Sequence, residues 1–221
     1  MSEPVSENGS EAAAAAAERD AELSVEERER RAEALAQVRT FGDPVLKSRA
    51  SEVSRFGAGL EREAERMVAI MRDALGVGLA ATQLGVMQRL FVFAAGPDAT
   101  PTVVANPRIE WLSDEIAKAE EGCLSLPGVA VDVERALYAK VRGQDVRGEP
   151  LALEAAGLEA RVLQHEIDHL DGVLMIDRTE RDQRKGALRA LREGETYAPP
   201  QPELDGDESL ERDQGRAGDP A

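Results

Sequence analysis

The stretch Gln164-His165-Glu166-Ile167-Asp168-His169 organises both the fold and the site of this chain. In a helix, residues four apart lie on one face, so His165 and His169 turn both imidazoles in the same direction. Glu166 lies about 100° further round such a helix, close enough to reach a metal-bound water. The chain has only two histidines, and both are here. The pattern therefore predicts a helix that offers two nitrogen ligands to a metal ion.

A third ligand has to come from elsewhere in the chain. A mononuclear catalytic site needs about three protein ligands and an open position for water, and an HExxH pattern alone also fits a solvated helix face. Cys123 is the only thiolate the chain can offer, although acidic residues are numerous enough to compete. A lone buried cysteine is more often a small hydrophobe. A single cysteine excludes an intramolecular disulfide and fits a reducing compartment.

The composition is typical of a soluble, acidic protein. With 221 residues, 42% of them hydrophobic, the chain is long enough for one domain with tails. Its net charge of -16 argues against general binding to DNA or to anionic membranes, because those surfaces repel an acidic chain. No apolar run approaches the roughly 18 to 20 residues that span a bilayer, and no signal peptide is recognisable. We therefore expect a cytoplasmic protein that binds neither DNA nor a membrane.

Both ends of the chain are acidic and poor in large apolar residues. Residues 1–38 carry 10 acidic and 4 basic side chains, and residues 199–221 carry 7 acidic and 2 basic side chains. Such segments favour disorder, although Ser24 and Glu27 form a capping-box pattern that could start a helix running toward Val38. The expected organisation is a disordered or partly helical extension, a catalytic domain and a disordered, proline-containing tail, at 1–37, 38–195 and 196–221.

Hydrophobic periodicity predicts an α+β fold. Apolar residues at helical spacing indicate helices over 60–75, ending at Gly76, and over 157–170, where the two histidines lie. In the second helix the residues expected to face the core are Leu158, Val162, Leu163 and Ile167. The runs between the two helices are typical of strands, expected at 89–95, 102–111 with an interruption at Asn106-Pro107, 115–121, two segments within 129–146, and 151–153 after a turn at Arg147-Gly148. We expect a mainly antiparallel sheet packed around the central metal-binding helix, with one helix on its N-terminal side and another at the C-terminal end.

The stretch Gly76-Val77-Gly78-Leu79-Ala80-Ala81-Thr82-Gln83 follows the first predicted helix. Its small residues let the backbone pass close to another group, and the Gln83 amide can donate two hydrogen bonds. The pattern differs from a dinucleotide-binding fingerprint, because the third glycine is missing and a helix precedes it. By itself the stretch is typical of a tight turn.

Three separated motifs, taken in order, resemble the peptide deformylase family. That family combines GxGxAAxQ, EGCxS and QHExDH, which match residues 76–83, 121–125 and 164–169 here. The general resemblance extends from about residue 38 to residue 193 and leaves both tails outside. It implies a bacterial-type, metal-dependent hydrolase of protein biosynthesis. Such an enzyme removes the N-formyl group from the formylmethionine of new polypeptides, by attack of a metal-activated water on the formyl carbonyl.

The resemblance also implies roles for individual residues. Glu166 corresponds to the general acid/base, and Gln83 and the backbone N–H of Leu124 correspond to the donors that stabilise the oxyanion. Gly78 is implied to accept the extended peptide backbone. The implied metal ligands are Cys123, His165 and His169. The implied lining residues of the methionine pocket are Val77, Leu158 and Val162.

The metal and its charged surroundings are predicted less directly. The usual metal of the family is ferrous iron, and zinc is often bound but commonly less active; thiolate and imidazole ligands suit both ions. Glu121 and Arg135 fall where the family has charged residues near the site, so we expect them to support the ligands without touching the metal. Arg161 lies next to that helix face and is expected to face solvent.

Two other functions are compatible with parts of the pattern. One is a zinc peptidase that uses HExxH, which would need a downstream third ligand such as Glu180 or Glu193. The other is a catalytically idle relative that acts as a binding module. The last predicted helix is basic, and a solvated amphipathic helix is the simpler interpretation of its charges. Weak docking of residues 181–192 near ribosomal RNA, where formylated chains emerge, is the sharper hypothesis.

Overall fold

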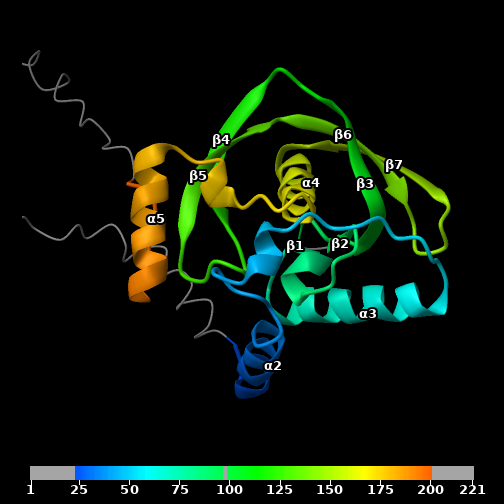
Figure 1. Ribbon diagram of the computed structural model, residues 1–221, viewed down its shortest axis with the longest axis horizontal. Coiled ribbons are helices and arrows are strands. Elements are labelled where there is room, and N and C mark those ends of the chain that lie inside the picture. The colour runs from blue at the N-terminus through cyan, green and yellow to red at the C-terminus, as the bar shows by residue number, and fades with distance from the viewer. Residues whose placement is uncertain (1–22, 97–98, 201–221) are drawn as a thin grey trace, which may run out of the picture.

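The computed structural model describes residues 23–96 and 99–200, and within them the fold is α+β, as predicted. Its α-helices in these ranges are α2 (Val25–Leu35), α3 (Ala58–Asp73), α4 (Gly157–Leu170) and α5 (Arg181–Glu193). Figure 1 shows α4 in the middle of the molecule with strands arching over it, α3 and α2 below it, and α5 at one side. No helix in the described ranges is long and apolar enough to cross a membrane.

The strands form two antiparallel sheets. The larger sheet has the order β1-β2-β3-β6-β7, and the smaller one pairs β4 with β5. The strands are β1 (Gly78–Ala80), β2 (Leu90–Phe93), β3 (Thr102–Leu112), β4 (Ile116–Gly122), β5 (Ala130–Ala136), β6 (Tyr138–Gln144) and β7 (Pro150–Ala156). The predicted strands are therefore present, distributed over two sheets that lie on different sides of α4.

The predicted interruption of β3 is a β-bulge. Asn106 has a φ of 50°, and the register between β3 and β6 shifts between Ala105 and Arg108. The Asn106 side chain accepts a hydrogen bond from the Val53 N–H at 2.8 Å and donates one to the Val53 carbonyl at 3.0 Å. These bonds stabilise the left-handed backbone and tie the segment before α3 to the sheet.

Helix α4 is buried on most of its surface because strands contact it from several sides, including β1, β2, β5, β6 and β7. Val162, Leu163 and Ile167 face the core as predicted. Leu158 does not: it is 55% exposed, because it lies in the first turn, beyond the cover of the sheet. The helix ends before Gly172, where a Cβ would lie 2.7 Å from the Lys47 carbonyl oxygen, so this turn requires glycine.

Helix α3 ends at Asp73, slightly before its predicted end. Leu75 adopts the left-handed conformation, with a φ of 59°, and the Gly76 N–H donates to the Met71 carbonyl at 2.8 Å. A Cβ at Gly76 would lie 3.1 Å from Leu124 Cδ1, so a side chain here would require Leu124 to shift. This glycine therefore lets the cysteine segment approach the glycine-rich segment.

Helix α2 belongs to the N-terminal extension. Its predicted capping box is present: the Glu27 N–H donates to Ser24 Oγ at 3.2 Å, and the Ser24 N–H donates to Glu27 Oε2 at 2.8 Å. Ala34 is buried, and α2 packs against α3. The rest of the expected extension, residues 1–22, and most of the expected tail, 201–221, lie outside the described residues. The domain boundaries remain predictions.

Candidate metal centre and active site

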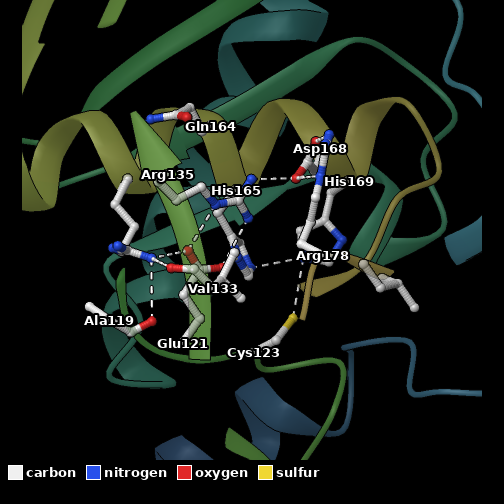
Figure 2. Close-up of polar contacts among 12 residues, drawn as sticks. Ala119, Glu121, Cys123, Val133, Arg135, Gln164, His165, Asp168, His169 and Arg178 are labelled. Atoms are coloured by element: carbon white, nitrogen blue, oxygen red, sulfur yellow. Dashed lines mark hydrogen bonds and ion pairs between the residues drawn. The ribbon is translucent and has the colours of Figure 1, made fainter. Parts of the chain in front are cut away.

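The three predicted ligands come together from different parts of the chain. The two histidines lie one turn apart on α4, and Cys123 lies in the loop that follows β4. Cys123 Sγ lies 3.2 Å from His169 Nε2, which in turn lies 3.2 Å from His165 Nε2. Dashed lines mark these contacts in Figure 2. All three ligand atoms lie within 4.8 Å of one another. One metal ion could bind all three.

The carboxylates considered as competing ligands lie elsewhere. Glu180 Oε1 accepts from Lys118 Nζ at 2.8 Å, and Glu193 pairs with Arg189 at 3.6 Å within α5. Both pairs are largely exposed, and neither glutamate belongs to the cluster that could hold a metal. The geometry therefore favours Cys123 as the third ligand.

Glu121, on β4, holds His165 from the side opposite the cluster. Its Oε2 lies 3.0 Å from His165 Nδ1, which leaves Nε2 turned toward Cys123 and His169. Arg135 donates to both carboxylate oxygens at 2.9 Å, as Figure 2 shows. Burial alone would raise the pKa of Glu121, but the hydrogen bonds from His165 and Arg135 outweigh it and hold the pKa well below its usual range. Glu121 thus holds the predicted ligand His165, and Arg135 holds Glu121.

The prediction that Arg161 faces solvent is wrong. Arg161 is only 9% exposed, and it donates to Glu121 Oε1 at 2.7 Å and to the Val133 carbonyl at 2.9 Å. Arg161 precedes His165 by four residues, so both side chains leave the same face of α4, toward the β4–β5 sheet. This four-residue spacing is the sequence feature that could have indicated the role of Arg161, because it places the guanidinium beside the Glu121 carboxylate, which holds His165.

Asp168 and Arg178, to which the sequence assigned no role, extend the network. Asp168 is buried and accepts from Arg135 Nη1 at 2.5 Å and from Arg178 Nη2 at 2.6 Å (Figure 2). Arg135 therefore bridges two buried carboxylates, Glu121 and Asp168. Their charges are compensated inside the protein, which a buried ion needs in order to be tolerated.

Gln83 joins the glycine-rich segment to the cysteine segment. Its Oε1 accepts from the Ala80 N–H at 2.8 Å, which fixes the orientation of the amide. Its Nε2 donates to Ser125 Oγ at 3.2 Å and lies 3.6 Å from Cys123 Sγ. Leu124 follows Cys123 directly, and its side chain packs against the core near α3. The structure thus places the Gln83 amide beside Cys123, one of the predicted ligands.

Glu166 contacts the backbone of β1. A Cβ added to Gly78 would lie 2.3 Å from Glu166 Oε1, so a residue with a side chain would displace this carboxylate. Burial raises the pKa of Glu166 to about 7. Its Oε2 is buried and has no hydrogen-bond partner among the described residues. A buried polar atom of this kind is costly unless a bound group uses it.

These residues border one cleft of about 520 Å³. Gln83, Glu121, Cys123, His165 and Glu166 lie along it, whereas His169 is buried beneath. The predicted substrate-binding residues all line the cleft: Val77, Gly78, Leu158 and Val162. Three lining residues that the sequence analysis did not single out are Arg31, Leu35 and Leu75.

Comparison with known proteins agrees with this geometry. A family model described as Polypeptide deformylase matches residues 35–185. The chain belongs to the polypeptide deformylase family. It is 43% identical over 165 residues to the peptide deformylase of Parafrankia sp. (strain EAN1pec), covering 75% of this chain and 90% of that one. It is 52% identical over 142 residues to the peptide deformylase of Thermotoga neapolitana, covering 64% and 85%.

Solved deformylase structures share the fold. The crystal structure of the Thermotoga maritima deformylase superposes with a TM-score of 0.63 and 48% identity, over 65% of this chain and 96% of that one. A deformylase from Synechococcus elongatus, solved in complex with actinonin, gives a TM-score of 0.67 and 40% identity, over 72% and 88%. The deformylase fold therefore includes the elements that position all three predicted ligands.

Proposed function

We propose that Cys123, His165 and His169 hold the metal ion of a peptide deformylase. The reaction follows from family membership: polypeptide deformylases are metal-dependent hydrolases that remove the formyl group from the N-terminal formylmethionine of new polypeptides. One observation carries the assignment of the residues. The three ligand atoms converge within 4.8 Å, and Glu166 and Gln83 border the same cleft.

The donor set fits a catalytic metal. One thiolate and two imidazoles leave a position open for water, and the Glu121 carboxylate orients one of the imidazoles. These donors suit both iron and zinc, and we propose Fe(II) by resemblance to the family, with Zn(II) as the alternative. When bound, such an ion supplies positive charge that acidifies a water and polarises the formyl carbonyl.

Glu166 is proposed as the general acid/base. It accepts a proton from the attacking water as the water oxygen bonds to the formyl carbon. When the carbon–nitrogen bond breaks, Glu166 delivers that proton to the leaving nitrogen, so that formate and a free methionine amine result. The buried Glu166 Oε2, without a partner among the described residues, supports this role because it is available to bind water.

Gln83 and the backbone N–H of Leu124 are proposed to stabilise the negative charge that develops on the formyl oxygen. The bond from Ala80 fixes the Gln83 amide, so its donor group needs little reorganisation during the reaction. Leu124 directly follows Cys123, so its N–H belongs to the same loop as that proposed ligand.

The cleft suits a formylated methionine. Gly78 carries no side chain that could block the extended peptide backbone next to Glu166. Val77 and Leu158 expose apolar surface along the cleft, and Val162 lies buried beside them. We propose that these three side chains bind the methionine side chain. Gly76 and Gly78 line this part of the cleft and let the protein backbone approach the substrate closely.

We propose a cytoplasmic location and, at most, weak ribosome contact through α5. Five basic residues lie on this helix: Arg181, Arg184, Lys185, Arg189 and Arg192. Acidic neighbours neutralise part of this charge, since Arg184 pairs with Asp177 at 3.3 Å and Arg189 with Glu193. Docking to ribosomal RNA would therefore be salt-sensitive. Absent or salt-insensitive cosedimentation with ribosomes would reject it.

One experiment tests the function directly. The full chain is purified without oxygen, its metal content is measured, and turnover of a formyl-Met-Ala-Ser peptide is compared with that of the acetylated analogue. We expect about one divalent ion per chain and hydrolysis of the formyl peptide alone. A metal-loaded protein that hydrolyses neither peptide would support the idle binding module instead.

A further inference from the structure

A short segment after α5 lies along one side of the active-site cleft. Residues 126–130 form this side, here called the rim, and all five line the cleft. Helix α5 is followed by Gly194, whose left-handed backbone (φ 71°) turns the chain back toward the rim. Residues 195–197, here called the strap, then run beside it. The family model matches the chain only as far as residue 185, so the strap lies beyond the matched segment.

Tyr197 joins the strap to the rim through its backbone. Its N–H donates to the Gly128 carbonyl at 2.9 Å, and its carbonyl accepts from the Ala130 N–H at 2.8 Å. These two bonds flank Val129, which forms a parallel bridge with Tyr197. Gly128 has a φ of 72°, and a Cβ there would lie 3.3 Å from Thr196 Cγ2. Glycine at this position therefore suits both the backbone of the rim and the close approach of the strap.

The ring of Tyr197 fixes the strap on α5. A Cβ added to Gly186, within α5, would lie 2.3 Å from Tyr197 Cε2, so the ring fills the space that a larger residue would need. The ring is partly buried against the core cluster that contains Leu126 and Val129 of the rim. A glycine inside a helix costs stability, and the contact with the ring gives Gly186 a structural reason.

Helix α5 is itself bound to the strand that continues from the rim. The Asp132 N–H of β5 donates to Gln183 Oε1 at 2.8 Å, and Gln183 Nε2 donates to the Asp132 carboxylate at 2.9 Å. Helix α5 also packs against β5. The helix, the ring and the strap therefore form one support for the rim.

The rim is connected to the proposed cysteine ligand by two consecutive turns. The Leu126 N–H donates to the Cys123 carbonyl at 2.9 Å, and the Val129 N–H donates to the Leu126 carbonyl at 3.2 Å. The cysteine segment has a second attachment, because the Ser125 carbonyl accepts from the Phe41 N–H at 2.8 Å. Release of the strap is therefore expected to loosen the rim while the metal stays bound.

We propose that Tyr197 is a positioning residue for substrate binding, because it fixes the rim of the cleft through its ring and its backbone. This inference rests on the proposed function. Tyr197 does not itself line the cleft, so it acts only through residues 126–130. A loose rim would have to become ordered when a peptide binds, and this loss of conformational freedom would weaken binding.

The test compares metal-loaded, full-length variants on a formyl-Met-Ala-Ser peptide. Tyr197→Ala removes the ring, and Gly186→Ala removes the space for the ring while favouring the helix. Both should raise KM about 3- to 10-fold, the effect of losing roughly one hydrogen bond, with kcat and metal content near those of the wild type. Hydrogen exchange of the Ala130 amide should become faster in both. Tyr197→Phe keeps the ring and should retain the wild-type KM and exchange rate.

The matched controls are Tyr138→Ala and Gly59→Ala. Tyr138 is the other tyrosine of the chain, and Gly59 is a helical glycine of α3 at which a Cβ would meet nothing within 4 Å. Neither residue lines the cleft. Both variants should therefore keep the wild-type KM and the wild-type exchange of the Ala130 amide.

Several results would overturn the positioning role. One is an unchanged KM, or an unchanged exchange of the Ala130 amide, in Tyr197→Ala and Gly186→Ala. Another is a fall in kcat at constant KM, which indicates loss of folded protein rather than a looser rim. Failure of the metal-loaded wild type to hydrolyse any formyl peptide would instead overturn the proposed function, and the exchange rates would still show whether the strap holds the rim.

Discussion

Glu121 Oε2 lies 3.0 Å from His165 Nδ1, and this pair ties the metal site to the β4–β5 sheet. The same carboxylate accepts from Arg135 and Arg161, so the imidazole is held by a buried network with compensated charges. The orientation of a ligand on α4 thus depends on a residue of β4. A change at Glu121 is expected to act on metal binding and on folding together.

Glu121→Gln should weaken metal binding about 10- to 100-fold, because the amide holds the imidazole less firmly than the carboxylate does. It should also lower the free energy of unfolding of the metal-free protein by about 3–5 kcal/mol, since the buried Arg161 loses its carboxylate partner and the buried Arg135 keeps only Asp168. Chelator competition and urea unfolding measure the two effects. Glu120→Gln, at the exposed neighbouring position, is the control, and equal effects of both changes would contradict the prediction.

Cys123→Ala should abolish stable metal binding, because two imidazoles alone bind a divalent ion weakly. Metal content after dialysis measures the result. Glu180→Ala and Glu193→Ala are the matched controls, and both should retain the metal, because their carboxylates lie outside the cluster. Full retention by Cys123→Ala would revive the zinc peptidase with a carboxylate as third ligand.

Glu166→Gln should retain the metal and lose about 10²- to 10⁴-fold in kcat, because the amide cannot accept the proton of the attacking water. Steady-state assays with a formyl-Met peptide and metal analysis of the same sample test this. Glu159→Gln, on the same helix but not on the cleft, should behave like the wild type. Near wild-type turnover by Glu166→Gln would remove this residue from the mechanism.

Gly78→Ala should lower kcat about 10²-fold with little loss of metal, because the new Cβ would lie 2.3 Å from Glu166 Oε1 and displace the carboxylate. Gly122→Ala is a close control: Gly122 also lines the cleft, but a Cβ there meets nothing within 4 Å. If both variants lost activity equally, the contact with Glu166 would not be the cause.

Much of the fold could be predicted because its elements carry strong local patterns. The α4 helix, the capping box of α2 and the turn at Arg147-Gly148 each depend on residues close in sequence. The predictions were wrong where contacts between residues distant in sequence determine the structure. Leu158 has the spacing of a core residue, but the sheet does not extend over the first turn of α4. Helix α3 ends at Asp73, and Leu75 takes the left-handed conformation, although the sequence places the glycine one residue later.

The predictions for the site likewise depended on whether local sequence or contacts between distant residues place each side chain. The motif resemblance predicted the metal ligands, whereas Arg161 was assigned to solvent and Asp168 and Arg31 were not recognised. A sequence does not show which element packs against a given face of a helix. The burial of Arg161 therefore could not be predicted, because it depends on the positions of β4 and β5. Arg31 lies in a segment that reads as a polar extension, and only the packing of α2 on α3 places it at the cleft.

Local spacing was enough to place two histidines and a glutamate on one helix, because the helical repeat alone determines their directions. The three motifs in order were enough to indicate the chemistry. Only the folded chain brings Cys123 to His169, 46 positions away, and Gln83 to Cys123. The physical reason is that burial of α4 between two sheets, rather than any local preference, holds the three segments together around one cleft.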